Sequence, residues 1–166
     1  MSSIKTLYIV RHAKSSWGDA DLSDFDRPLD KRGIKDAQLL FSHWATEFKR
    51  IEHIATSPAN RAWSTSMLFC QTADVSQNLI SNYESLYEAS TADVYEVVKS
   101  FSNDISAAAL VGHNPSLTYF VNQFIKRQID NLPTTGIVKL VFNCTRWNQI
   151  SRERLVDSKF DFPKNH

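Results

Sequence analysis

A short apolar run that ends on charged residues, close to the start of the chain, places the strongest constraint on the fold. Leu7-Tyr8-Ile9-Val10 has the uniformly apolar, partly β-branched character of a buried strand, and Arg11 and His12 follow it directly. In an open α/β sheet, ligands bind at the carboxyl ends of the strands. A guanidinium fits phosphate or carboxylate oxygens, and an imidazole nitrogen can act as nucleophile, base or metal ligand. The stretch therefore predicts an anion site, although an exposed Arg-His pair without function is the alternative.

Two further predicted strands end next to cationic or ionisable residues. The strand over 51–56 leads into Ser57-Pro58, a pair typical of a helix start, and Arg61 lies in the first turns of that helix, off its apolar stripe. The small, apolar strand over 107–111 ends just before His113, and a cap-and-proline pair follows it. Since parallel strands end at the same edge of a sheet, we expect these junctions to converge. The predicted cluster has four members: Arg11, His12, Arg61 and His113.

Strands alternate with amphipathic helices along the chain, a pattern typical of a mostly parallel sheet between helical layers. Asp30 can cap the first helix and Thr91 the third. The helix after Ser57-Pro58 has a predicted apolar face of Ala59, Trp63, Met67 and Cys70. Two strands, 136–142 and roughly 153–160, complete the sheet. The predicted fold class is α/β, a three-layer α/β/α sandwich, and the length fits a single domain over residues 1–166.

Composition excludes several classes of partner. Nineteen basic and eighteen acidic residues give a formal net charge of +1, so no overall positive field favours nucleic acid. No apolar run is long enough to span a membrane, and no signal-peptide pattern is present, so we expect a cytoplasmic protein. Cys70 and Cys144 are isolated, and we interpret both as buried apolar residues rather than a disulfide or metal pair. Residues 163–166 are expected to form a frayed tail.

The predicted cluster suits a phosphoryl group that is held by side chains. Guanidinium groups match phosphate oxygens and neutralise the charge that spreads over them in the transition state. The chain has four glycines and no GxxxxGK run, which excludes a P-loop. Neither cysteine is followed, after five residues, by an arginine, which argues against a cysteine phosphatase. A histidine nucleophile takes its place, and His12, at the end of a rigid strand, is the better candidate.

These junctions resemble motifs of the histidine phosphatase superfamily. The similar stretches are Leu7 to Ala13 for the RHG-type signature, Ser57 to Ala62 for the second-arginine motif, Val111 to Pro115 for the second-histidine motif, and Arg27-Pro28-Leu29 with Arg32-Gly33 for a further common stretch. Ala13 stands where many members have glycine. The compact size and the stretch Leu86-Tyr87-Glu88-Ala89-Ser90 look most like the short bacterial members of the SixA phosphohistidine phosphatase type.

The resemblance implies a phosphoglycerate mutase-like fold and a two-step phosphatase mechanism. His12 would attack phosphorus in line, and water would hydrolyse the phosphohistidine intermediate. Arg11, Arg61 and His113 would bind the phosphate oxygens, and the two guanidinium groups would keep His12 unprotonated. No metal ion and no cofactor is implied. Glu88 would protonate the leaving oxygen, as an acidic residue from this region does in larger members, but a solvated loop carboxylate is an equal alternative.

An open pocket is expected, because the segment between Tyr83 and Thr91 is too short to hold the insertion that covers the site in larger members. An open pocket favours phosphohistidine on a protein as the substrate, with a small phosphomonoester as the alternative. Two other classes remain. One is a phosphate-binding module without turnover; the other is a metal site of His12 and His113, where the adjacent arginines would repel a cation. Neither a nucleic-acid nor a membrane partner is expected.

Overall fold

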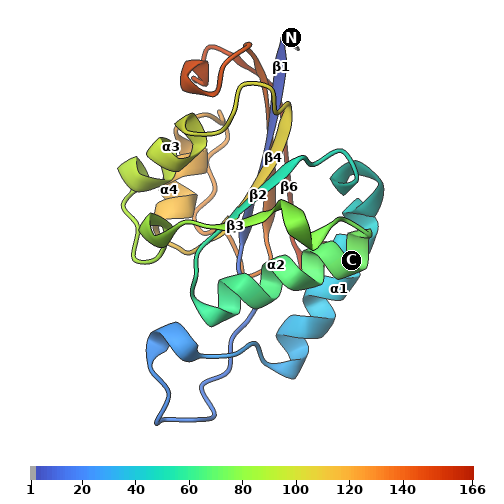
Figure 1. Cartoon of the computed structure of the whole chain (residues 1–166), viewed down its shortest axis with the longest axis vertical. Helices are drawn as coiled ribbons and strands as arrows, with labels where there is room; N and C mark the ends of the chain where they lie inside the picture. The colour runs from blue at the N-terminus through green and yellow to red at the C-terminus, as the bar shows by residue number, and fades with distance from the viewer. Residues whose placement is uncertain (1–2) are drawn as a thin grey trace.

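A six-stranded sheet forms the centre of the molecule in the computed structural model, which describes residues 3–166 (Figure 1). The strands are β1 (Ile4–Arg11), β2 (His53–Thr56), β3 (Ile80–Asn82), β4 (Ala107–Gly112), β5 (Ile137–Asn143) and β6 (Leu155–Asp161). Their order is β3-β2-β4-β1-β5-β6. The first four strands run parallel, whereas β5 is antiparallel to β1 and β6 is antiparallel to β5. The prediction of a mostly parallel sheet is therefore confirmed.

Helices cover both faces of this sheet. The α-helices are α1 (Lys31–Phe48), α2 (Asn60–Ala73), α3 (Thr91–Lys99) and α4 (Ser116–Asn122), and the short 3-10 helices are η1 (Asp24–Asp26), η2 (Gln77–Leu79), η3 (Glu84–Leu86), η4 (Trp147–Gln149) and η5 (Pro163–Asn165). Helices α1 and α2 pack on one face, and α3 and α4 pack on the other (Figure 1). This arrangement is the predicted three-layer α/β/α sandwich.

The alternation of side chains along β1 divides the hydrophobic interior into two cores. Leu7 and Ile9 point to the core that α3 and α4 complete, whereas Tyr8 and Val10 point to the core beneath α1 and α2. All four side chains are at most 3% exposed. A strand buried on both faces needs such an uninterrupted apolar run, which explains why the polarity change at its end stands out in the sequence.

The start of α2 differs from the prediction. The helix begins at Asn60 rather than at Pro58, and the Ser57 hydroxyl accepts a hydrogen bond from the Ala59 backbone N–H (3.3 Å) without capping the helix. The face that packs on the sheet is also different, since Trp63 is 37% exposed. Small polar residues take its place: the Thr65 hydroxyl donates to the Arg61 carbonyl oxygen (2.7 Å), which allows Thr65 to be buried.

Of the other two predicted helix caps, one is confirmed and one is wrong. Asp30 caps α1 as predicted, because its carboxylate accepts a hydrogen bond from the Gly33 N–H (2.6 Å). Helix α3 is capped by Ser90 rather than by Thr91, and Ser90 and Asp93 form a capping box. The predicted and the observed cap of α3 are one residue apart, so the helix lies almost where the sequence predicts it.

The end of the chain is ordered, and the prediction of a frayed tail is wrong. Residues Pro163–Asn165 form η5, and the buried Asp161 carboxylate holds them in place. This carboxylate accepts hydrogen bonds from Trp44 Nε1 (2.8 Å), Asn165 Nδ2 (3.1 Å) and His166 Nε2 (2.9 Å). The C-terminal segment is thereby attached to α1.

Three strand ends meet at the edge that carries the predicted cluster. Arg11 is paired with Gly112 in the register of β1 and β4, and Thr56 is paired with Val111 in that of β2 and β4. Segment 15–30, blue in Figure 1, extends from this end of the sheet. No helix within residues 3–166 has the length and apolar character needed to cross a bilayer. Cys70 and Cys144 are buried free thiols, as predicted.

Candidate active site

A cavity of about 290 Å³ contains all four residues of the predicted cluster. Arg11 ends β1, His12 follows it, Arg61 lies in the first turn of α2, and His113 follows β4. Ten residues line the cavity: Arg11, His12, Lys14, Ser15, Trp17, Arg27, Arg61, His113, Asn114 and Thr134. The expectation that three strand-to-helix junctions converge in space is thus met by the geometry.

The His12 ring is held in one tautomer by the backbone. Its Nδ1 lies 2.7 Å from the Ala13 carbonyl oxygen, which can only accept, so Nδ1 carries the hydrogen and Nε2 keeps its lone pair. The pKa of His12 is lowered to about 4: burial is the largest cause, the Ala13 hydrogen bond opposes the shift, and the positive charges of Arg61 and Arg11 add to it. Burial is therefore a larger cause than the guanidinium charges that the sequence suggested. The ring is neutral at pH 7.

The backbone beside this ring also explains the alanine at position 13. Ala13 is fully buried, and its N–H donates to the Thr65 hydroxyl (2.9 Å). Its φ is not in the left-handed region, which among residues 3–166 only Asp74, Glu88 and Thr135 occupy. A glycine is therefore not needed here, and alanine fits without strain.

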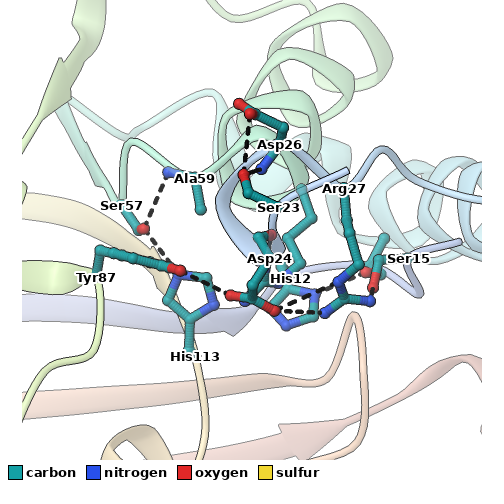
Figure 2. Close-up of polar contacts among 12 residues, drawn as sticks. His12, Ser15, Ser23, Asp24, Asp26, Arg27, Ser57, Ala59, Tyr87 and His113 are labelled. Carbon is teal, nitrogen blue, oxygen red and sulfur yellow. Dashed lines mark hydrogen bonds and ion pairs between the residues drawn. The ribbon is translucent and has the colours of Figure 1, made fainter. Parts of the chain in front are cut away.

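The second histidine lies beside the first. The ring centroids of His12 and His113 are 5.2 Å apart, and His113 Nε2 is 2.7 Å from the Ser57 hydroxyl oxygen. Burial, followed by His12 and Arg61, lowers the pKa of His113 to about 3, so this ring is also neutral at pH 7. If Ser57 donates to Nε2, Nδ1 of His113 bears the hydrogen and is available as a donor (Figure 2).

Three buried side-chain nitrogens, all from residues that line the cavity, have no hydrogen-bond partner within residues 3–166. They are Nε of Arg11, Nε of Arg61 and Nδ1 of His113. Other donors of the same arginines are used, since Arg11 Nη1 donates to the Leu132 carbonyl oxygen (2.9 Å). Burial, and then the charge of Arg61, lowers the pKa of Arg11. Unpartnered buried donors are costly, and an anion with several oxygens would satisfy them together.

Arg27 is a third guanidinium at the cavity, which the sequence reasoning did not assign to the site. It is buried, its Nη1 donates to the Ser15 hydroxyl (2.6 Å), and its Cζ lies 3.6 Å from the centre of the Trp17 ring. Trp17 is itself 77% exposed. The similarity of Arg27-Pro28-Leu29 to a family stretch could have pointed to Arg27. Because Arg27 belongs to a long acidic loop, however, the sequence offered no reason to expect its side chain at the cavity.

The structure does not bring Glu88 into the cavity. Its side chain is exposed, and it is not among the lining residues. The neighbouring Tyr87 reaches the site instead: its hydroxyl donates to Asp24 Oδ2 (2.8 Å), as Figure 2 shows. Although partial burial opposes the shift, hydrogen bonds from Tyr87 and Arg61 lower the pKa of Asp24 to about 2. No group of three or more His, Cys, Asp or Glu side chains within residues 3–166 is arranged to hold a metal ion.

Comparison with known proteins identifies the family. Residues 7–91 match the sequence model of the histidine phosphatase superfamily (branch 1). The chain belongs to this superfamily. An uncharacterised protein of Mycobacterium tuberculosis is 31% identical over 142 residues, which cover 79% of this chain and 85% of the relative. One from Mycobacterium leprae is 29% identical over 168 residues, covering 93% and 100%. Membership supports phosphatase activity as the class of reaction.

Solved structures show the same fold. SixA from Agrobacterium tumefaciens superposes with a TM-score of 0.76 at 23% identity, covering 93% of this chain and 97% of its own. The protein histidine phosphatase SixA complexed with tungstate gives 0.75 at 18% identity, covering 96% and 98%. Phosphoglycerate mutase from Bacillus anthracis gives 0.61 at 14% identity, covering 84% and 88%. The predicted phosphoglycerate mutase-like fold, with its likeness to the short SixA members, is confirmed.

Proposed function

We propose that this chain, as one histidine phosphatase domain over residues 1–166, hydrolyses phosphohistidine on proteins without a metal ion. The observation that carries the proposal is a neutral His12 whose free Nε2 shares a cavity with three guanidinium groups. An imidazole with an available lone pair is a nucleophile, and the cations around it suit a phosphoryl group.

In the first step, His12 Nε2 attacks phosphorus and forms a nitrogen–phosphorus bond. The bond from phosphorus to the leaving imidazole breaks, and the leaving nitrogen keeps the electron pair and takes a proton from water. Arg11 Nε, Arg61 Nε and His113 Nδ1 are the buried donors without partners, and they would bind the nonbridging oxygens. These donors stabilise the negative charge as it spreads over the oxygens in the transition state.

In the second step, water attacks the phosphoenzyme. The bond between His12 and phosphorus breaks, inorganic phosphate leaves, and the electron pair returns to Nε2. The buried environment that lowers the pKa of His12 to about 4 restores the neutral ring for the next cycle. Both steps use side chains at strand ends or, for Arg61, in the first turn of α2, and neither step requires Glu88.

Two features favour phosphohistidine over a small phosphomonoester. An alkoxide leaves far less readily than an imidazole and needs a general acid. Asp24 cannot serve as one, because its pKa is about 2 and it is ionised at neutral pH. The second feature is Trp17, whose exposed ring lines the cavity and provides an aromatic surface where the cavity meets solvent. Such a ring can stack on a leaving imidazole.

The proposal is tested by trapping the intermediate with a phosphohistidine peptide. We expect an acid-labile, base-stable phosphoenzyme that is absent in His12→Ala and unchanged in His43→Gln, since His43 is exposed on α1 and does not line the cavity. Wild-type turnover in His12→Ala contradicts the nucleophile assignment. Turnover of aryl or sugar phosphates that is faster than turnover of phosphohistidine favours a phosphomonoesterase. Phosphate binding without a phosphoenzyme indicates a binding module. Loss of activity in excess chelator indicates a metal enzyme.

A further inference from the structure

The Asp24 carboxylate connects three separate parts of the site (Figure 2). Its Oδ2 accepts hydrogen bonds from Arg61 Nη2 (3.1 Å) and the Tyr87 hydroxyl (2.8 Å), and its Oδ1 accepts from Arg27 Nη2 (3.1 Å) and Nε (3.3 Å). The backbone oxygen of Asp24 also accepts from Arg61 Nη1 (2.7 Å). One residue of η1 thereby fixes side chains from the loop, from α2 and from the segment before α3.

The donors that Asp24 uses determine those that remain for a substrate. On Arg61 it engages one hydrogen each of Nη1 and Nη2, while the buried Nε has no partner within residues 3–166. On Arg27 it engages Nε and Nη2, and Ser15 engages Nη1. An arginine side chain has many rotamers, and a pair of hydrogen bonds from neighbouring guanidinium nitrogens restricts the orientation of its plane. Asp24 accepts such a pair from each arginine: from Nη1 and Nη2 of Arg61, and from Nε and Nη2 of Arg27.

Charge gives Asp24 a second effect. Arg11, Arg27 and Arg61 all line one small cavity, and their positive charges repel one another. Asp24 forms ion pairs with Arg27 and Arg61, and no other carboxylate within residues 3–166 pairs with any of the three. The low pKa of Asp24 keeps this counter-charge in place throughout the working pH range. A phosphate group therefore meets a site whose positive charge is partly neutralised.

We propose that Asp24 is a positioning residue for phosphoryl transfer: it aligns the guanidinium groups of Arg27 and Arg61, and its negative charge weakens phosphate binding so that the product leaves. The inference rests on the proposed function, because it takes both arginines as ligands of the phosphoryl group. It predicts opposite effects on two measurable quantities. Without the carboxylate, phosphoryl transfer slows, whereas inorganic phosphate binds more tightly.

The test compares Asp24→Asn with Asp26→Asn. The first variant keeps the shape of the side chain and removes its charge. We expect phosphoenzyme formation in a single turnover to slow by roughly 10- to 100-fold, which is less than for the loss of a donor itself because both arginines remain, and the inhibition constant of inorganic phosphate to fall several-fold. Asp26 is the matched control: it lies in the same 3-10 helix, its carboxylate accepts from the Ser23 hydroxyl (2.9 Å), and within residues 3–166 it forms no ion pair with an arginine. We expect Asp26→Asn to leave both quantities unchanged.

The outcomes separate this inference from the proposed function. A wild-type protein without a phosphoenzyme overturns the proposed function itself. If the wild-type protein forms a phosphoenzyme and Asp24→Asn forms it at the same rate, the role of Asp24 is overturned. The role is also overturned if Asp24→Asn forms the phosphoenzyme more slowly and binds inorganic phosphate more weakly. If Asp24→Asn fails to fold by circular dichroism, Tyr87→Phe decides, since it removes one hydrogen bond to the same carboxylate without changing its charge. Slower transfer in Tyr87→Phe at an unchanged unfolding temperature supports the inference, and an unchanged rate overturns it.

Discussion

His12 is expected to resist protonation far below neutral pH. An ordinary imidazole has a pKa of 6.5, and burial lowers the pKa of His12 to about 4. At pH 5, the ring should therefore be roughly nine-tenths neutral, whereas an ordinary histidine would be only a few per cent neutral. The difference corresponds to about 3 kcal/mol in the free energy of protonation. His12 should therefore remain neutral, and able to act as a nucleophile, at a pH at which an exposed histidine is protonated.

The assay is an NMR pH titration of protein with isotope-labelled histidine, in which His12→Gln identifies the resonance by its absence. We expect a midpoint near 4 in the wild type. In Arg61→Gln the pKa of His12 should rise, because a positive charge that disfavours the imidazolium is removed, but it should stay below 6.5 because burial is the larger cause. A wild-type midpoint near 6.5, or a fall of the pKa in Arg61→Gln, would refute the reasoning.

The same shift makes folding stability depend on pH. His12 stays neutral in the folded protein while the unfolded chain takes up a proton below its pKa of 6.5, so the stability that depends on this group is complete above pH 6.5. It falls as the pH drops from 6.5 to about 4, by up to about 3 kcal/mol, and stays constant below. Urea unfolding at pH 7 and pH 4.5 should therefore show a smaller difference in His12→Gln than in the wild type.

Three further substitutions test other parts of the structure. Arg61→Lys keeps the charge but loses the guanidinium contacts, and we expect phosphoenzyme formation to slow by roughly 10²- to 10³-fold; an unchanged rate contradicts the role of Arg61. Gly33→Ala places a Cβ in steric conflict with the Lys14 carbonyl oxygen, so urea unfolding should show a loss of about 1–3 kcal/mol. Trp44→Phe removes the hydrogen bond to Asp161 (2.8 Å) and should cost about 1–3 kcal/mol by the same measurement; wild-type stability in either variant contradicts the contact.

The strand ends of the site follow from local sequence, whereas the loop over them does not. Arg11 ends a buried strand and His12 and His113 directly follow buried strands, and a parallel sheet brings such positions to one edge. Arg27 and Asp24 belong to a segment without periodicity. The place of Asp24 depends on its contact with Arg61, 37 positions away, and Arg27 is in turn held by Asp24 and Ser15. No local pattern encodes such contacts.

Two errors in the prediction have the same physical origin. Hydropathy predicted that Trp63 would be buried, but Trp63 is 37% exposed while Thr65 and Ser66 are fully buried. The two hydroxyls donate to carbonyl oxygens one turn earlier, which removes the penalty for burying them. The second error is the prediction of a frayed C-terminal tail. The tail is ordered because the buried Asp161 accepts hydrogen bonds from Trp44 and from His166 in the C-terminal segment. Hydrogen-bond partners within the fold can therefore bury a polar residue that hydropathy alone predicts to be exposed.

Many phosphate sites use backbone N–H groups as donors, whereas the candidate donors here belong to side chains that are buried at a cost to stability. Arg11 and Arg61 each keep a buried nitrogen without a partner, and the imidazole of His12 is held in an environment that disfavours its charged form. None of these arrangements favours the folded state by itself. Each would become favourable when a phosphoryl group accepts the donors and when Nε2 attacks phosphorus, so the same groups that lower stability would stabilise the transition state.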